Sequence, residues 1–188
     1  MEALIQMDGN ILLWIQDHLR NPVLTPVVKA ITSLGNSGIF WILLTILLLL
    51  FRRTRKAGIA SAVALIISFI MVNLIVKNVV NRTRPYEVVE GLRCLVERQM
   101  DASFPSGHAS ASFASSVALL MYLPWKKAAA GLVILAGIIA FSRLYVGVHY
   151  PTDVLAGILF GILSAVLAVW LIRYVEKVQR KKKGEDEV

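Results

Sequence analysis

Hydrophobic residues gather into long runs that short polar stretches separate. Five runs contain few or no charged side chains: 39–51, 57–80, 108–123, 128–141 and 154–172. The longer runs approach the roughly 20 residues that a helix needs to cross a hydrocarbon core of about 30 Å. Backbone amides in lipid must be satisfied within their own segment, so several such runs in one chain predict helices rather than a sheet. The expected fold is all-α, a polytopic transmembrane helical bundle with five or six spans.

The N-terminal region follows a different pattern. Residues 11–19 and 23–34 are apolar along one stripe, but polar residues and prolines interrupt them, which is typical of interfacial amphipathic helices. The short run 39–51 spans a membrane only if 31–37 continues it. An alternative is a sixth span built from 11–34, and the pattern leaves both open. Glu2 and Asp8 stand where a secretory signal would be basic, so we expect no cleaved signal.

We expect a single membrane domain over residues 1–188. It consists of an amphipathic region (1–37), a transmembrane core (38–175) and a cytoplasmic tail (176–188). Two polar connections interrupt the core, at 81–106 and 142–153. Polar residues next to transmembrane segments are candidates for function, so these connections are the predicted active-site loops. Gly157 and Gly161 form a GxxxG pair, which we interpret as close helix packing.

Composition supports the membrane class, and the charges orient the chain. Hydrophobic residues make up 57% of the 188 residues, the mean hydropathy is +0.68, and the net charge is +8. The basic residues lie beside the apolar runs, at 52–56, 126–127 and 173–183, which argues against a nucleic-acid partner. Short basic loops stay in the cytoplasm. We therefore expect a multi-pass protein of the cell membrane with a cytoplasmic C-terminus and both active-site loops on the outer side. Its oligomeric state stays open.

The side chains at the outer ends of the predicted spans suit a phosphoryl group. Lys77, Arg84 and Arg143 supply three cations, and guanidinium groups match phosphate oxygens in bidentate fashion. Ser106 and Gly107 precede the run 108–123, where a helix N-terminus favours an anion. The pattern predicts a phosphate-binding site.

Two histidines accompany these cations. A neutral, oriented imidazole can attack phosphorus, and a carboxylate on its other nitrogen commonly orients it. His149 and Asp153 flank Pro151, which suits the first turn of a helix, so Asp153 can fold back against His149. His108 is then free to act as general acid and base.

The spacing of these residues resembles the tripartite signature of the type 2 phosphatidic acid phosphatase superfamily. Its three parts here are Lys77 with six residues before Arg84-Pro85, then Pro105-Ser106-Gly107-His108, then Ser142-Arg143 with five residues before His149 and three more before Asp153. The resemblance implies that His149 is the nucleophile that forms a phosphohistidine, with Asp153 as its orienting partner and His108 as acid and base. It also implies a phosphate site of Lys77, Arg84, Ser106, Gly107 and Arg143, and a metal-independent reaction without a cofactor.

These observations predict a membrane lipid phosphatase or diphosphatase whose partners are a lipid phosphate and the bilayer. The apolar runs make the chain similar to the bacterial membrane branch of the superfamily, which includes undecaprenyl diphosphate phosphatases and phosphatidylglycerophosphate phosphatases. Undecaprenyl diphosphate is the first expected substrate, and phosphatidylglycerophosphate or phosphatidic acid is the alternative. A lipid phosphotransferase and a non-catalytic lipid transporter are further alternatives.

Overall fold

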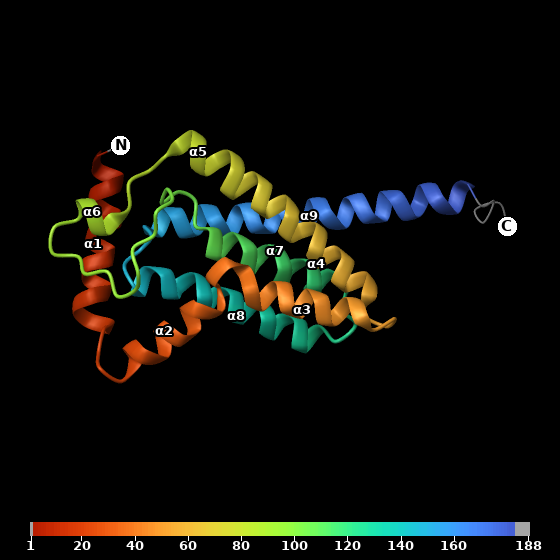
Figure 1. Cartoon of the computed structure of the whole chain (residues 1–188), viewed down its shortest axis with the longest axis horizontal. Coiled ribbons are helices and arrows are strands. Elements are labelled where there is room, and N and C mark those ends of the chain that lie inside the picture. Colours follow the sequence, from red (N-terminus) through yellow and green to blue (C-terminus); the bar gives the residue numbers. More distant parts are fainter. Residues whose placement is uncertain (1, 183–188) are drawn as a thin grey trace.

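The computed structural model describes residues 2–182, and regular structure in this part of the chain is helical (Figure 1). In chain order the main helices are α1 (Glu2–Leu19), α2 (Leu24–Leu34), α3 (Ile39–Leu50), α4 (Arg55–Ser68), α5 (Lys77–Val80), α6 (Pro85–Val88), α7 (Gly107–Tyr122), α8 (Lys126–Tyr145) and α9 (Pro151–Lys182). A 3-10 turn, η1 (Asn36–Gly38), joins α2 to α3, and a π-helix, η2 (Phe69–Val76), joins α4 to α5. The all-α membrane fold predicted from the sequence is confirmed.

Helix α1 crosses one end of a bundle formed by α3, α4, α7, α8 and α9 (Figure 1). Its Leu12 and Ile15 are buried, whereas Met7, Ile11 and Trp14 are exposed. This two-sided character agrees with the amphipathic region expected at 1–37.

Residues 11–34 do not form one continuous helix. The Oδ1 atom of Asn21 accepts hydrogen bonds from the backbone N–H groups of Val23 and Leu24, at 3.1 and 2.8 Å. Such an Asx turn competes with helical hydrogen bonding, so it separates the end of α1 at Leu19 from the start of α2 at Leu24. Helix α2 is instead followed closely by α3, and the two helices are bent by 48°.

Helix α7 occupies the middle of the bundle, and small side chains allow its neighbours to approach it. Ala114 and Ala118 pack against alanines of α4 and α9. Ser110 on α7 and Ser68 on α4 exchange a hydroxyl hydrogen bond of 2.5 Å. Small residues and buried hydroxyl pairs are the usual means of packing helices in a membrane.

The two glycines of the GxxxG pair bring α9 against α7. A Cβ atom on Gly157 would lie 2.5 Å from the carbonyl oxygen of Ser106, and one on Gly161 would lie 2.5 Å from that of Ser110. Only glycine allows this approach. The interpretation of the pair as a packing motif is confirmed.

Three helical stretches within residues 2–182 are long and apolar enough to cross a membrane, namely Arg55–Val88, Lys126–Tyr145 and Pro151–Lys181, and the bent α2–α3 pair would make a fourth. Helix α7 has only 16 residues. The predicted number of five or six spans therefore stays a prediction.

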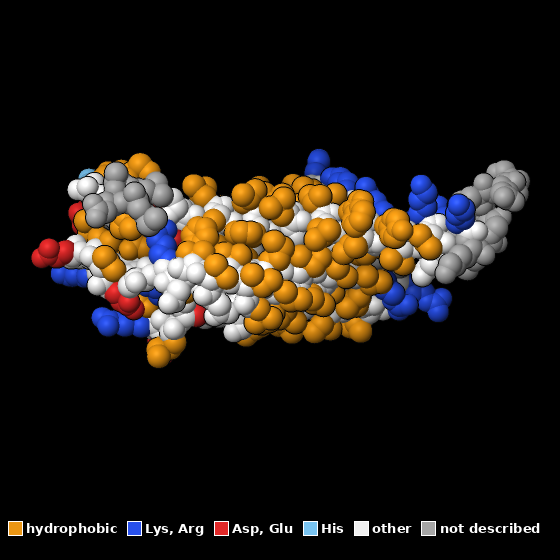
Figure 2. All heavy atoms as spheres, turned by 90° about the horizontal axis from the view of Figure 1, so that it is seen from above, with side chains coloured by type: hydrophobic (Ala, Val, Ile, Leu, Met, Phe, Trp, Pro, Cys, Tyr) orange, Lys and Arg blue, Asp and Glu red, His pale blue; other side chains and the backbone are white. Residues whose placement is uncertain are grey.

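The basic clusters meet at one end of the bundle. Lys56 pairs with Glu176 at 2.7 Å, and the guanidinium of Arg53 lies 5.2 Å from the ring centre of Trp125. These contacts join the α3–α4 turn, the α7–α8 turn and the distal part of α9. Figure 2 shows a broad apolar belt with Lys and Arg side chains beyond it toward the C-terminus, and charges of both signs at the opposite end. The shared location expected for the clusters is thus observed.

Candidate active site

A cavity of about 630 Å³ is lined by residues of α3, α4, η2, α7 and α8 and of the segments between them. Six of the eight predicted site residues line it: Lys77, Arg84, Gly107, His108, Arg143 and His149. They come from α5, the start of α6, α7, α8 and the α8–α9 loop. The three separate parts of the signature therefore meet at one place.

Two of the three cations share one carboxylate, that of Asp101. Lys77 forms an ion pair with it, and Nη2 of Arg84 lies 2.8 Å from its Oδ1 atom. Lys77 and Arg84 are buried, but about half of the Asp101 side chain is exposed. Burial favours a neutral carboxyl, but the hydrogen bonds and charges of Lys77 and Arg84 outweigh it and lower the pKa of Asp101 to about 2. The site thus holds a resident anion.

Arg143 is the third cation. Its Nη1 donates a 2.8 Å hydrogen bond to Oγ1 of Thr32 on α2. Its Nε is buried and finds no hydrogen-bond acceptor among the described residues. A buried guanidinium donor without an acceptor is costly, and an anion in the cavity would supply one.

His149 is buried between this cavity and Asp153. Nη1 of Arg84 lies 3.5 Å from its Nε2, and Oδ2 of Asp153 lies 3.5 Å from its Nδ1. An arginine can only donate, so this contact favours a lone pair on Nε2 and the proton on Nδ1. Burial lowers the pKa of His149 to about 4, and Arg84 and Arg143 add to the effect while Asp153 opposes it. The imidazole is therefore neutral at pH 7, with Nε2 on the side of Arg84.

The contact between Nδ1 of His149 and Asp153 is longer than a usual hydrogen bond. Nδ1 makes no hydrogen bond within residues 2–182. Catalytic hydrogen bonds are often long in the absence of substrate, and the ion-pair distance keeps Asp153 within reach.

His108 faces the same cavity from the first turn of α7. Its Nε2 lies 3.1 Å from Oδ1 of Asn36. The ring is packed closely against the α2–α3 connection, because a Cβ atom on Gly35 would lie 2.5 Å from its Cδ2. Both histidines therefore share one cavity.

Ser106 and Asp153 stand outside the cavity lining. Ser106 is fully buried, caps α7 by accepting from the N–H of Ala109 at 3.5 Å, and donates its own N–H to the carbonyl of Asp153 at 3.0 Å. Its hydroxyl thus serves the helix cap, and its place in the phosphate site stays a prediction. Gly107 does line the cavity, beside Asn73 and Lys77.

The comparisons with known proteins agree with this geometry. Residues 57–177 match the model of the PAP2 superfamily. The chain belongs to the PAP2 superfamily. Proteins similar to the chain include an undecaprenyl-diphosphatase of Sulfolobus acidocaldarius, 40% identical over 69% of this chain and 62% of that protein. A bacitracin transport permease protein of Bacillus licheniformis is 31% identical over 79% of this chain and 71% of its own length.

A solved structure resembles the whole bundle. The transmembrane PAP2-type phosphatidylglycerolphosphate phosphatase of Bacillus subtilis superposes with a TM-score of 0.75 at 26% identity, over 93% of this chain and 89% of that one. The Sulfolobus and Bacillus subtilis proteins are phosphatases by name, which agrees with the enzyme class predicted for this PAP2 protein. The chain spans less than two thirds of the Sulfolobus protein.

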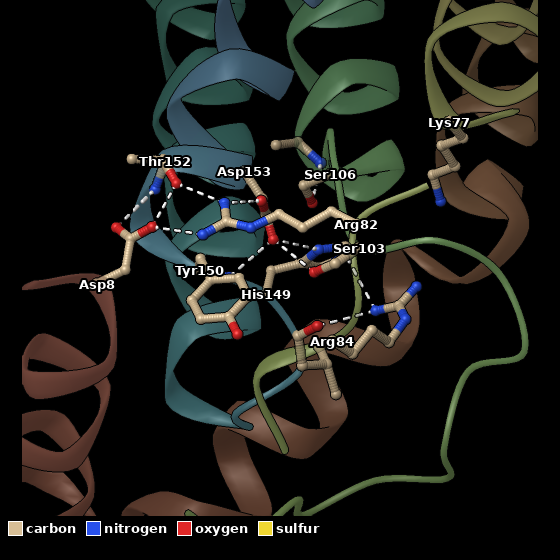
Figure 3. Close-up of polar contacts among 12 residues, drawn as sticks. Asp8, Lys77, Arg82, Arg84, Ser103, Ser106, His149, Tyr150, Thr152 and Asp153 are labelled. Atoms are coloured by element: carbon tan, nitrogen blue, oxygen red, sulfur yellow. Dashed lines mark hydrogen bonds and ion pairs between the residues drawn. The ribbon is translucent and has the colours of Figure 1, made fainter. Parts of the chain in front are cut away.

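Several residues around the site of this PAP2 protein were not predicted from the sequence. Asp153 accepts a 2.6 Å hydrogen bond from Arg82, and its other oxygen accepts from Oγ of Ser103 at 2.5 Å and from the N–H of Tyr150 at 2.9 Å (Figure 3). Arg82 also reaches Asp8 of α1 at 3.0 Å. Asn73 lines the cavity one helical turn before Lys77. Of these, Asn73 alone had a local signal, a polar residue inside an apolar run.

Within residues 2–182 no group of three or more His, Cys, Asp or Glu side chains is arranged to hold a metal ion.

Proposed function

We propose that this PAP2 protein is a membrane lipid phosphatase that hydrolyses a lipid phosphate or diphosphate through a phosphohistidine on His149. The supporting observation is a single cavity with three cations and two imidazoles at one end and hydrocarbon at the other. This combination matches an amphiphile with a phosphorylated headgroup.

The apolar part of the cavity supports a lipid rather than a soluble phosphate ester. Ile42, Ile46 and Leu49 of α3 line it on one side, and Leu65, Ile66 and Phe69 of α4 and η2 line it on the other. Ile42, Ile46, Ile66 and Phe69 also count among the exposed large hydrophobic side chains. A lipid tail can therefore leave the cavity sideways between α3 and α4, with its headgroup at the cations.

The proposed reaction has two displacement steps. Nε2 of His149 attacks the terminal phosphorus, its P–O bond to the lipid, or to the lipid phosphate in a diphosphate, breaks, and His108 gives a proton to the departing oxygen. His108 then takes a proton from water, the water oxygen attacks phosphorus, the N–P bond breaks, and inorganic phosphate leaves. Lys77, Arg84 and Arg143 stabilise the charge on the phosphoryl oxygens in both steps. Asp153 holds the Nδ1 proton as the ring becomes positive.

Undecaprenyl diphosphate is the first substrate that we propose, because the Sulfolobus relative carries the name undecaprenyl-diphosphatase at 40% identity. Phosphatidylglycerophosphate or phosphatidic acid is the alternative, since the similar solved structure is a phosphatidylglycerolphosphate phosphatase. Phosphate release by purified protein from a panel of these lipids separates the two. His149→Asn should lower release from the preferred lipid by at least about 10⁴-fold.

Two other outcomes would replace this proposal. A phosphorylated second lipid in place of free phosphate would make the protein a phosphotransferase. The name of the Bacillus licheniformis relative includes transport, and lipid movement by wild type and by His149→Asn alike, without hydrolysis by either, would favour a transporter.

We further propose that the site faces the outer side of the cell membrane and the C-terminus the cytoplasm. The start of α9, which follows His149, and the basic clusters lie at opposite ends of the bundle (Figure 1), and basic loops favour the cytoplasm. The substrate headgroup would then lie in the outer leaflet.

A further inference from the structure

We propose that Arg82 is a positioning residue for His149, acting through the carboxylate of Asp153. The inference rests on the proposed function, since it assigns a role in the same reaction. Arg82 does not line the cavity. It is connected to His149 through Asp153, which both side chains approach.

The side chain of Arg82 bridges two elements that hold the site. Its Nη1 donates to Oδ1 of Asp153 at 2.6 Å and to Oγ1 of Thr152 at 2.7 Å. Its Nη2 donates to Oδ2 of Asp8 at 3.0 Å. One guanidinium thus joins the first turn of α9 to α1 (Figure 3).

The two carboxylates around Arg82 have no access to solvent. Asp8 and Asp153 are both fully buried, and the side chain of Arg82 is 17% exposed. Buried carboxylates so close together repel each other unless a cation lies between them. The guanidinium also stacks on the ring of Tyr150, 3.8 Å from its centre, which fixes its plane.

Asp8 extends the arrangement to the N-terminal helix. Its Oδ1 accepts from the N–H of Thr152 at 3.3 Å, and its Oδ2 accepts from the Thr152 hydroxyl at 2.5 Å. An acid at a helix N-terminus is favourable, and this one comes from α1 instead of α9. The contacts tie the start of α9, and with it Asp153, to α1.

Arg82 determines which oxygen of Asp153 faces His149. Arg82 takes Oδ1, so Oδ2 stays beside Nδ1 of His149 at 3.5 Å, together with Ser103 and the N–H of Tyr150. Without Arg82 the carboxylate can rotate, and Oδ2 is no longer held within reach of the Nδ1 proton while Nε2 attacks phosphorus. The loss would appear in the chemical step, because Arg82 is not part of the phosphate site.

Three variants and a control test this role in the full-length protein, with phosphate release from the preferred lipid as the assay. Arg82→Gln should lower kcat by about 10- to 100-fold, which is the usual cost of losing a residue that orients a metal-ligating side chain in metalloenzymes. The KM should stay within about twofold of wild type. Arg82→Lys should restore only part of kcat, since an ammonium cannot bond Asp8 and Asp153 in one plane. Asp8→Asn should lower kcat in the same direction by a smaller factor. Arg98→Gln removes an exposed charge from the nearby loop and should match wild type.

The outcomes separate this inference from the proposed function. Absence of phosphate release from wild type on every lipid overturns the proposed function itself. Release by wild type with an unchanged kcat in Arg82→Gln, or with KM raised and kcat intact, overturns the role of Arg82 alone. If Arg82→Lys melts at the same temperature as wild type but forms the phosphoenzyme more slowly, Arg82 positions His149 for the reaction. A merely structural role would instead lower the melting temperature. If Arg82→Gln fails to fold, Arg82→Lys and Asp8→Asn still decide the matter.

Discussion

At the scale of single residues, Asp101 occupies the place where a substrate phosphate is expected. Its carboxylate joins Lys77 and Arg84, and a phosphate bound by the same cations must displace it. Half of the Asp101 side chain is exposed, so the loop side of the site gives it room to leave. We therefore expect the carboxylate of Asp101 to compete with anionic ligands of these two cations.

Replacing Asp101 with Asn should strengthen phosphate binding. The substitution removes the competing charge while keeping the side-chain volume, so the inhibition constant of inorganic phosphate should fall by about 3- to 10-fold at pH 7. Competition against lipid hydrolysis measures this constant. Glu97→Gln, an exposed carboxylate of the same loop, should leave it unchanged. Weaker inhibition in Asp101→Asn would mean that the carboxylate holds the cations in place for phosphate instead of competing with it.

The buried imidazole of His149 predicts how stability depends on pH. Its pKa is about 4 in the folded protein, against about 6.5 in an unfolded chain. The unfolded state binds the proton first, so stability falls as pH drops from about 6.5 to 4, by up to about 3 kcal/mol. Thermal unfolding in detergent across this range measures the loss. The His149→Asn variant lacks this group and should lose less; an equal loss in both proteins would contradict the shift.

The residues that the sequence identified are those in which local spacing carries the chemistry. Lys77, Arg84, His108, Arg143 and His149 follow a recognisable pattern, and all of them line the cavity. Asp8, Arg82 and Asp101 gave no such signal. Their meaning depends on contacts across the fold, such as the 74 positions between Asp8 and Arg82, and a lone charge in a polar stretch is compatible with many partners.

At the scale of helices, the close contact of α9 with α7 connects packing to the site. Gly157 lies against the carbonyl of Ser106, and the N–H of Ser106 bonds the carbonyl of Asp153 at 3.0 Å. The position of Asp153 thus depends on how closely the two helices approach.

Gly157→Ala should therefore lower stability and activity together. The added methyl would lie 2.5 Å from a backbone oxygen, and overpacking of this kind costs about 1–3 kcal/mol. Gly131→Ala in α8 is the matched control, because its Cβ meets nothing within 4 Å, and it should be neutral or stabilising by up to about 1 kcal/mol. Melting temperatures and kcat of the two variants check this, and equal behaviour would argue against a packing role for Gly157.

Helix boundaries were less predictable than helix existence. The apolar run 57–80 is one continuous helical stretch, but η2 at Phe69–Val76 interrupts its α-helical geometry. A π-helix changes which side chains share a face and is frequent at functional sites; here Phe69, Asn73 and Lys77 all reach the cavity. The hydrophobicity of the run does not reveal the change from α-helix to π-helix, because every residue type in Phe69–Val76 also fits an α-helix.

At the scale of the whole molecule, charge and chemistry divide the two ends of the bundle. The start of α9, which follows His149, lies beside α1, and the contacts Lys56–Glu176 and Arg53–Trp125 mark the other end. The sequence predicted this division because each turn between apolar runs reverses the direction of the chain. It could not predict that α1 would pack onto Tyr150 through Leu12, since an amphipathic stripe does not specify its partner.

The proposed orientation predicts which end a membrane-impermeant thiol reagent reaches in intact cells. With Cys94 replaced by Ser, the chain has no other cysteine, so single cysteines report one position each. Glu90, close to α1, and Arg52, at the basic end, are both exposed, so a cysteine introduced at either position reports its own side. Because basic loops are retained in the cytoplasm, Glu90→Cys should be labelled in intact cells and Arg52→Cys only after permeabilisation. The reverse pattern would place the cations and histidines on the cytoplasmic side, and the substrate headgroup would then have to lie in the inner leaflet.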